Sequence, residues 1–283
     1  MEEVNKSAIS WLHGLQEYFK FQEDEISSNY VDFILKLLYA NNPMITLTEE
    51  ADIVEFISLL RKFAHNNVFN AFHKYYREEH NSQHLQDAFS RGQVQSKIWL
   101  VTELSKIQKH YTNILVLAGW YGQLINYFKD ITFDNARIID KDREACLISD
   151  SIFNISLMEN YKVKAVASDI NELILHSKGY KFQIEHFKNP DRQIYEEMFL
   201  PDLIINTSSE HMDETWFEKI RYKRFETQPI VAIQSNNLFD IEEHVNCVHS
   251  IDHMKKKYPM KEILYEGELQ LTGYKRVMLI GYL

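Results

Sequence analysis

A run of polar side chains, Asn206–Met212 (NTSSEHM), begins at the last residue of the mainly apolar run DLIIN. Polar residues at the end of a buried strand commonly face a substrate. Asn206, Glu210 and His211 are therefore the candidate catalytic residues, with Glu210 or His211 removing a proton from an acceptor oxygen, amine or carbon acid. A structural alternative stays open, in which a serine of this run caps the next helix and both side chains only occupy its first turn.

A second polar cluster, QSNNLFDIEEHVNC, begins at Gln234 after the apolar run PIVAI. Neighbouring parallel strands end at the same edge of a sheet, so both clusters are expected to line one substrate pocket. The expected substrate-binding residues are Ser208, Ser209, Gln234, Asn236 and His244. A metal ion held by Glu210, His211 and His244 is an alternative use of these side chains. Their spacing fits no compact ligand motif, so the sequence predicts no metal site.

Two of the eight glycines of the chain lie in ILVLAGWYGQL, where an apolar run ends at Gly119 and Gly122 opens an expected helix. Glycine at the end of a first strand lets the backbone turn sharply and lets a ligand approach. Asp140 ends the run ARIID about 20 residues later, where an acid can accept hydrogen bonds from ribose hydroxyls. Asp169 follows VKAVAS and is placed to meet an adenine amino group. The alternative is an ordinary turn, with acids that cap helices.

The candidate residues can form one site only if a sheet brings the ends of its strands together. The sequence of the second part of the chain predicts such a sheet. Short apolar runs alternate with helix-length segments, which indicates βαβ units and a parallel sheet. The runs are NILVLA, ARIID, VKAVAS, DLIIN and PIVAIQS. The last stretch, EILYEGELQLTGYKRVMLIGYL, predicts two strands joined by a turn at Thr272 and Gly273.

The first part of the chain shows helical spacing of its apolar residues instead. It predicts a bundle of about five helices, with Ser27 or Ser28 as the cap of the second. We therefore predict a helical domain over 1–108 and an α/β domain over 109–283.

Composition limits the classes of function. The net charge of −10 is spread evenly along the chain, so nucleic-acid contact stays open but is not favoured. Two cysteines are too few for a disulfide framework or a zinc cage. No apolar run reaches the roughly 18 residues that span a bilayer, and the first residues lack the order of a signal peptide. We expect a cytoplasmic protein without membrane contact, and the sequence does not predict its oligomeric state.

Taken together, about residues 90–283 resemble a class I S-adenosylmethionine-dependent methyltransferase. VLAGWYG stands at the family's glycine-rich first motif, Asp140 at its ribose-binding acid, Asp169 at its adenine-side acid, and NTSSEHM in its loop after the fourth strand. The final hairpin matches the family's antiparallel seventh strand. The resemblance implies an α/β, Rossmann-like methyltransferase sheet with a terminal antiparallel hairpin, preceded by an all-α N-terminal domain.

The resemblance also implies S-adenosyl-L-methionine as the cofactor. The residues expected to bind it are Gly119, Trp120, Tyr121, Gly122, Asp140, Asp169 and Lys97. Lys97, on the helix before the first strand, would meet the methionine carboxylate; the alternative is an exposed polar helix face. The first motif departs from the family at Trp120 and Tyr121, where a small residue is usual. NAD is the competing cofactor and is less favoured, because a pyrophosphate needs a three-glycine turn.

The activity implied is methyl transfer to an acceptor that the sequence does not identify. A small metabolite, a nucleic-acid base and a protein side chain all stay open. One alternative is aminocarboxypropyl transfer of the nicotianamine synthase-like type, because a helical bundle precedes the cofactor fold there too. Another is a non-catalytic, partner-binding subunit, in which Trp120 and Tyr121 close the cofactor pocket.

Overall fold

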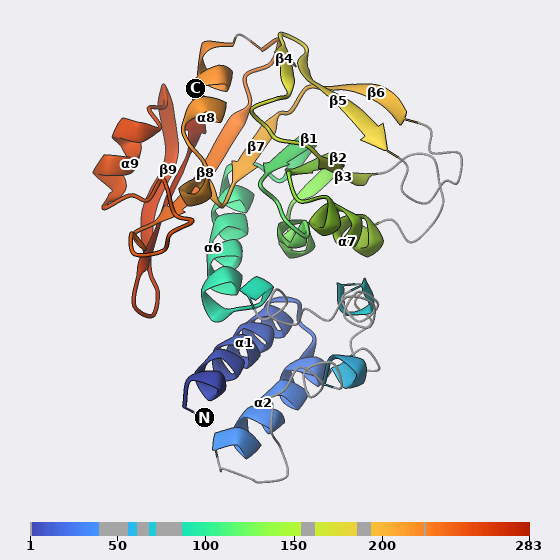
Figure 1. Cartoon of the computed structure of the whole chain (residues 1–283), viewed down its shortest axis with the longest axis vertical. Coiled ribbons are helices and arrows are strands. Elements are labelled where there is room, and N and C mark those ends of the chain that lie inside the picture. The colour runs from blue at the N-terminus through green and yellow to red at the C-terminus, as the bar shows by residue number, and fades with distance from the viewer. Residues whose placement is uncertain are drawn as a thin grey trace. The chain divides into compact units, whose positions relative to one another are not determined.

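In the computed structural model, the chain forms two compact units, Met1–Trp99 and Leu100–Leu283 (Figure 1). The structure describes residues 2–39, 56–60, 68–71, 87–153, 162–185, 194–223 and 225–283.

The first unit is helical in the part that the structure describes. Its long helices are α1 (Glu2–Phe21), α2 (Glu25–Tyr39) and α6 (Arg91–Ile107), the last of which continues into the second unit. Trp11, Leu15 and Phe19 of α1 are buried, as helical spacing requires of a core-facing stripe. The cap of α2 is Asp24, and neither of the two predicted serines. Its carboxylate accepts hydrogen bonds from the Ser27 backbone N–H at 3.0 Å and from the Ser27 hydroxyl at 2.6 Å.

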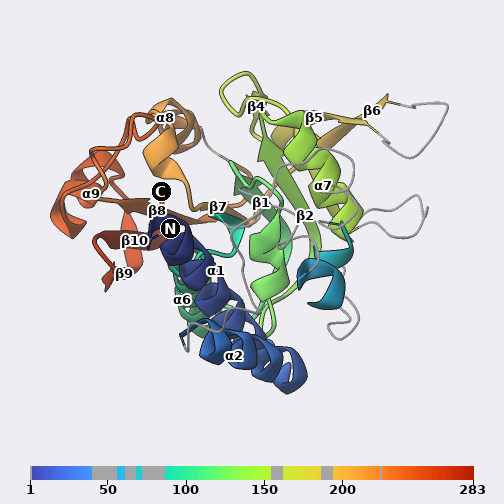
Figure 2. The ribbon, with the colours of Figure 1, turned by 60° about the horizontal axis from the view of Figure 1, so that its bottom comes forward.

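The second unit contains a seven-stranded sheet with the order β3-β2-β1-β7-β8-β10-β9 (Figures 1 and 2). The strands are β1 (His110–Leu117), β2 (Thr132–Asp140), β3 (Val163–Ala167), β7 (Leu203–Asn206), β8 (Ile230–Asn236), β9 (Glu262–Gln270) and β10 (Lys275–Tyr282). The first five in this order are parallel, and β10 is antiparallel to both β8 and β9. This confirms the predicted Rossmann-like methyltransferase sheet with a terminal antiparallel hairpin.

The connections between these strands are α7 (Arg143–Phe153), α8 (Thr215–Tyr222) and α9 (Ile251–Lys257), with two short 3₁₀ helices, η1 (Gln123–Tyr127) and η2 (Ser209–His211). The helix expected after Gly122 is only the five-residue η1. The chain therefore crosses from β1 to β2 without an α-helix.

The connection from β3 to β7 differs from the helix-length crossover that the sequence analysis expects. It forms a separate antiparallel sheet of β4 (Ile174–His176), β5 (Gly179–Glu185) and β6 (Ile194–Phe199). The reason is visible in β5, where Tyr180 and Phe182 are buried and the residue between them is not. Burial with a period of two residues specifies a strand and excludes a helix.

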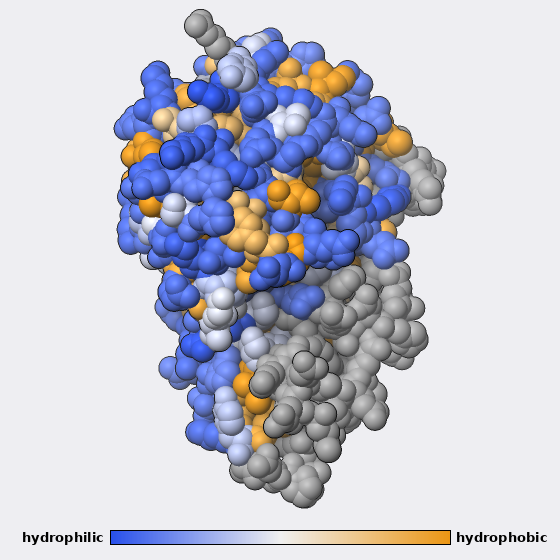
Figure 3. Space-filling model, turned by 60° about the vertical axis from the view of Figure 1, so that its left-hand side comes forward, coloured by the Kyte–Doolittle hydropathy of each residue, from blue (hydrophilic) through white to orange (hydrophobic). Residues whose placement is uncertain are grey.

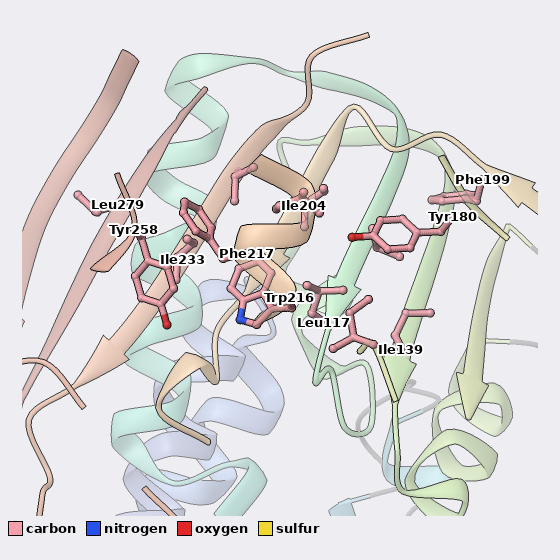
Figure 4. Packing of buried hydrophobic residues seen from close by; sticks show 14 of the residues in the cluster. Leu117, Ile139, Tyr180, Phe199, Ile204, Trp216, Phe217, Ile233, Tyr258 and Leu279 are labelled. Atoms are coloured by element: carbon pink, nitrogen blue, oxygen red, sulfur yellow. The ribbon is translucent and has the colours of Figure 1, made fainter. Parts of the chain in front are cut away.

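One face of the large sheet packs against α8 and α9. Trp216 and Phe217 of α8 lie over the strands in Figure 4, beside Tyr258, which follows α9. The Phe217 and Tyr258 rings meet edge to face at 5.1 Å between centroids. Strand residues such as Ile204 and Ile233 complete this core. The packing fixes the chain on both sides of η2, which carries the candidate catalytic residues.

The surface seen in Figure 3 is mainly hydrophilic, with hydrophobic side chains in small, separate groups. Within the described ranges, no helix combines the length and the apolar composition needed to cross a membrane.

Candidate functional site

The turn after β1 has an unusual backbone. Ala118 has a φ of 46°, Trp120 of 48° and Gly122 of 66°, so alternate residues adopt the left-handed conformation. This conformation costs about 1–2 kcal/mol for a residue other than glycine. Such strain persists where the surroundings hold it, and it clusters at ligand-binding sites. The turn is closed by a 2.8 Å hydrogen bond from the Gly122 N–H to the Gly119 carbonyl.

Asp140, at the end of β2, holds this turn in place. One carboxylate oxygen accepts the Trp120 N–H at 2.8 Å, and the other accepts the Asp142 N–H at 2.9 Å. Burial raises the pKa of Asp140, and these two hydrogen bonds partly offset the rise. Each carboxylate oxygen can accept a further hydrogen bond, because an ionised carboxylate has about four acceptor positions. The turn and the acid, both predicted as cofactor-binding, therefore lie in direct contact.

The two glycines of the turn are required for different reasons. A Cβ on Gly119 would lie 2.6 Å from the Ile138 side chain of β2, so packing excludes a larger residue there. Gly119 does not have a positive φ, and the space beside its Cα is filled by protein. Gly122 combines a positive φ with crowding, since a Cβ would lie 2.4 Å from Ile138 and 2.6 Å from the Ser149 hydroxyl.

Gly122→Ala is expected to lower the free energy of unfolding by about 2–4 kcal/mol, from left-handed strain and overpacking together. Gly273→Ala is the matched control, because Gly273 has a φ of 84° and a Cβ added there would have nothing within 4 Å. The control carries the conformational cost alone, so its thermal unfolding midpoint should fall less. Equal losses in the two variants would contradict the packing argument.

The remaining predicted cofactor residues are Trp120 and Tyr121 in the turn, Asp169 after β3, and Lys97 on α6. The Trp120 and Tyr121 rings stack on each other with centroids 4.1 Å apart. Asp169 is exposed, and one of its carboxylate oxygens accepts the Asn171 N–H at 2.8 Å. Lys97 belongs to the first unit, where its Nζ donates to Gln93 Oε1 at 2.8 Å. Their assignments to the adenine side and to the methionine carboxylate are proposals.

The loop after β7 is held by its own polar groups. Asn206 is fully buried, and its side-chain oxygen accepts the Ser208 N–H at 3.0 Å. Ser209 is also buried, and its hydroxyl donates to the Gln234 carbonyl of β8 at 2.8 Å. Ser208 precedes η2 without a capping hydrogen bond from its side chain. Asn206 and Ser209 thus position the loop, and the roles predicted for them toward a substrate are proposals.

Glu210 is buried, with 1% of its surface exposed, and its Oε1 is the centre of a polar network. This oxygen accepts hydrogen bonds from Asn236 Nδ2 at 2.7 Å and from Arg276 Nη2 at 3.3 Å. Arg276 also donates to the Thr207 carbonyl at 2.9 Å. The structure therefore unites both predicted polar clusters. It adds Arg276, which was not among the predicted site residues. The sequence sign of a buried role was a charged residue next to the apolar part of KRVMLIGY.

His211 and His244 come from separate loops and meet edge to face, with ring centroids 4.5 Å apart. His211 Nδ1 lies 3.2 Å from the Glu243 carbonyl oxygen, and His244 Nδ1 lies 3.0 Å from that of Leu238. A carbonyl oxygen only accepts, so both Nδ1 atoms carry hydrogen and donate it, and Nε2 is the remaining nitrogen of each ring. Burial lowers the pKa of His244, and the neighbouring His211 lowers it further.

The last predicted substrate residue, Gln234, lies inside β8 and is fully buried. Its carbonyl receives the Ser209 hydroxyl, and its side-chain nitrogen lies 3.5 Å from the Met278 sulfur of β10. Gln234 thus holds the loop after β7 through its backbone carbonyl. Its assignment to a substrate is a proposal.

No known protein family matches the sequence, and no curated protein matches it. The structure is similar to the N-methyltransferase NodS from Bradyrhizobium japonicum WM9, with 10% sequence identity, a TM-score of 0.47 and coverage of 66% of this chain and 94% of that chain. It is also similar to magnesium protoporphyrin IX methyltransferase (ChlM) from Synechocystis PCC 6803, with 10% identity, a TM-score of 0.46 and coverage of 80% and 96%. The assignment of the fold rests on the strand order and the terminal hairpin.

Proposed function

We propose that the second unit binds S-adenosyl-L-methionine at the ends of β1, β2 and β3 and transfers its methyl group to an acceptor at the loops after β7 and β8. The contact between Asp140 and the Trp120 N–H carries this proposal. It places a strand-end acid against the strained turn of the first strand, where open α/β sheets bind ligands. The acceptor is not identified by these residues.

The cofactor roles follow from this placement. Asp140 accepts hydrogen bonds from the ribose hydroxyls through its remaining acceptor positions. Asp169 meets the adenine side, and the turn Gly119–Gly122 passes the methionine part. Trp120 occupies a left-handed position that glycine takes most easily. The turn therefore has two glycines, where a pyrophosphate is suited by three. This favours a sulfonium cofactor without phosphates over NAD.

When bound, S-adenosylmethionine supplies a methyl group on a positively charged sulfur, and the product is S-adenosylhomocysteine. The residues of this chain orient the acceptor in line with that methyl group and accept its proton where one is lost. The Nε2 atoms of His211 and His244 and the Glu210 carboxylate are the candidate proton acceptors. Glu210 is held by Asn236 and Arg276, so its position is fixed before an acceptor arrives.

Calorimetric titration with S-adenosylmethionine, S-adenosylhomocysteine and NAD tests the cofactor. Wild-type protein is expected to bind both adenosyl ligands and not NAD. Asp140→Ala is expected to weaken both by at least about tenfold, because a hydrogen-bonded carboxylate contributes about 1.5–3 kcal/mol.

Asp142→Ala is the matched control for this titration. Asp142 caps α7 by accepting the Glu144 and Ala145 N–H groups at 2.8 and 3.1 Å, so its loss should cost about 1 kcal/mol of stability and leave cofactor binding unchanged. Absence of adenosyl-ligand binding in the wild type would overturn the proposal and favour a partner-binding subunit. Methylthioadenosine as the product, in place of S-adenosylhomocysteine, would indicate aminocarboxypropyl transfer.

A further inference from the structure

Three side chains converge at the loops after β7 and β8. One carboxylate oxygen of Glu210 and one ring nitrogen each of His211 and His244 lie within 4.8 Å of one another. Glu210 is buried, His244 is partly buried and His211 is exposed, so the cluster opens toward solvent on one side. Two of these residues are adjacent in η2 and the third follows β8, which is why no compact motif announces the cluster in the sequence.

Both imidazole rings are oriented through Nδ1, which turns Nε2 into the available ligand atom of each ring. Each donates its Nδ1 hydrogen to a backbone carbonyl, of Glu243 for His211 and of Leu238 for His244. A metal-bound histidine nearly always makes such a bond through its second nitrogen, which fixes the ring and leaves Nε2 as the ligand. Two histidines in one cluster share this arrangement here.

The Glu210 carboxylate supplies an independent observation. Its Oε2 atom is buried and has no hydrogen-bond partner in the part of the chain that the structure describes. A buried acceptor without a partner costs about 1–3 kcal/mol. The opposite oxygen, Oε1, is fixed by Asn236 at 2.7 Å and Arg276 at 3.3 Å. The carboxylate is thus anchored on one side and unsatisfied on the other.

We propose that Glu210, His211 and His244 bind one divalent transition-metal ion through Oε2 and the two Nε2 atoms. Two nitrogens and one oxygen suit zinc, cobalt or iron(II), and not calcium or magnesium, which prefer oxygen alone. Tetrahedral ligands about 2.1 Å from zinc lie about 3.4 Å apart. The ligand atoms of this cluster lie within 4.8 Å of one another, so no pair has to close by more than about 1.4 Å. His211 is exposed, so its side chain can shift toward the other two ligands while its Nδ1 bond to the Glu243 carbonyl bends.

Three protein ligands leave a fourth position open to water or to an oxygen of the acceptor, as in catalytic zinc sites. The metal site itself does not rest on the proposed methyl transfer, since the metal alone is expected to bind. Only the role of the open position toward an acceptor rests on the proposed function. A bound ion occupies Oε2 and the two Nε2 atoms, so these atoms accept the acceptor's proton only in the metal-free protein.

Metal binding is tested on the full chain, without an affinity tag that contains histidine and after dialysis against a chelator. Cobalt(II) is titrated while its visible absorption is recorded, and zinc is then added to displace it. The expected result is one cobalt ion per chain, with bands that zinc abolishes. His211→Ala and His244→Ala are each expected to weaken binding by at least about tenfold, the lower end of the loss seen for supporting groups around a metal.

His253→Ala is the matched control, because His253 is a histidine of the same unit that lies beside His249, with ring centroids 5.4 Å apart. It should bind cobalt as the wild type does. Glu210→Gln should weaken binding too, and circular dichroism checks that it remains folded. Absence of cobalt binding in the wild type, or equal binding in His211→Ala, His244→Ala and the wild type, would overturn the proposal.

The same samples are titrated with S-adenosylmethionine, so that the two proposals fail separately. A wild-type protein that binds the cofactor and does not bind cobalt counts against the metal site alone. Metal binding without cofactor binding counts against the proposed function alone.

Discussion

Replacing Asp150 with alanine is expected to lower the free energy of unfolding of the protein by about 3–5 kcal/mol, the usual cost of leaving one member of a buried ion pair alone. Asp150 lies on α7 and pairs with Lys164 of β3, and the two side chains are 8% and 1% exposed. Asp150 also accepts the Ala165 N–H at 3.0 Å. The variant therefore loses the pair and a backbone hydrogen bond together.

The loss should depend on pH in a definite direction. Burial lowers the pKa of Lys164, and Asp150 opposes this effect, so Asp150→Ala lowers that pKa further. At pH values between the lowered pKa of Lys164 and its unfolded value of about 10.4, the folded state binds fewer protons than the unfolded state. Stability therefore rises with pH in this range. The deficit of Asp150→Ala relative to wild type is expected to be larger at pH 7 than near pH 10. Urea unfolding at both values measures it.

Two further variants separate the ion pair from a general loss of packing. Asp150→Leu combined with Lys164→Met replaces the pair by apolar groups and should recover the part of the stability that the unpaired charge costs, while the hydrogen bond to the Ala165 N–H stays lost. Asp252 pairs with Lys255, and its side chain is 80% exposed. Asp252→Ala should therefore leave the unfolding midpoint unchanged. An Asp150→Ala protein as stable as wild type would show that Lys164 finds another partner or reaches water.

Arg276→Met is expected to have a similarly large effect, about 3–5 kcal/mol, because it leaves the buried Glu210 carboxylate without its counter-charge. Both side chains are nearly inaccessible, 4% exposed for Arg276 and 2% for Glu210. The variant also removes the hydrogen bond to the Thr207 carbonyl. The loop Asn206–Met212 should therefore exchange its amide hydrogens faster than in wild type, while the amides of β1 and β2 do so only through global unfolding.

Arg143→Met is the matched control for this variant. Arg143 pairs with Glu185 at 3.0 Å, but the two side chains are 49% and 29% exposed, so its loss should shift the urea midpoint only slightly. Combining Arg276→Met with Glu210→Gln removes both charges and should restore part of the stability. If the double variant were no more stable than Arg276→Met, the charge of Glu210 would not be the cause.

Much of the fold follows from local patterns in the sequence. The apolar runs that form β1, β2, β3, β7 and β8 are largely buried and parallel, as mainly apolar runs predict for strands covered on both faces. The turn at Gly273 joins β9 and β10 as expected. The error lay between β3 and β7, where an expected helix is the sheet β4-β5-β6. The alternation of apolar and polar residues in GYKFQIE, the sequence of β5, is a short-range signal that was available there.

The sequence by itself determined the sheet, its terminal hairpin, and which residues stand at the ends of its strands. Those properties depend on neighbours along the chain, through hydrophobic period and turn chemistry. Only the tertiary structure decided which of these side chains touch. It paired Glu210 with Arg276, brought His244 to His211, and set Asp140 against the Trp120 N–H. Contacts between distant segments depend on strand order and packing, which no local pattern encodes.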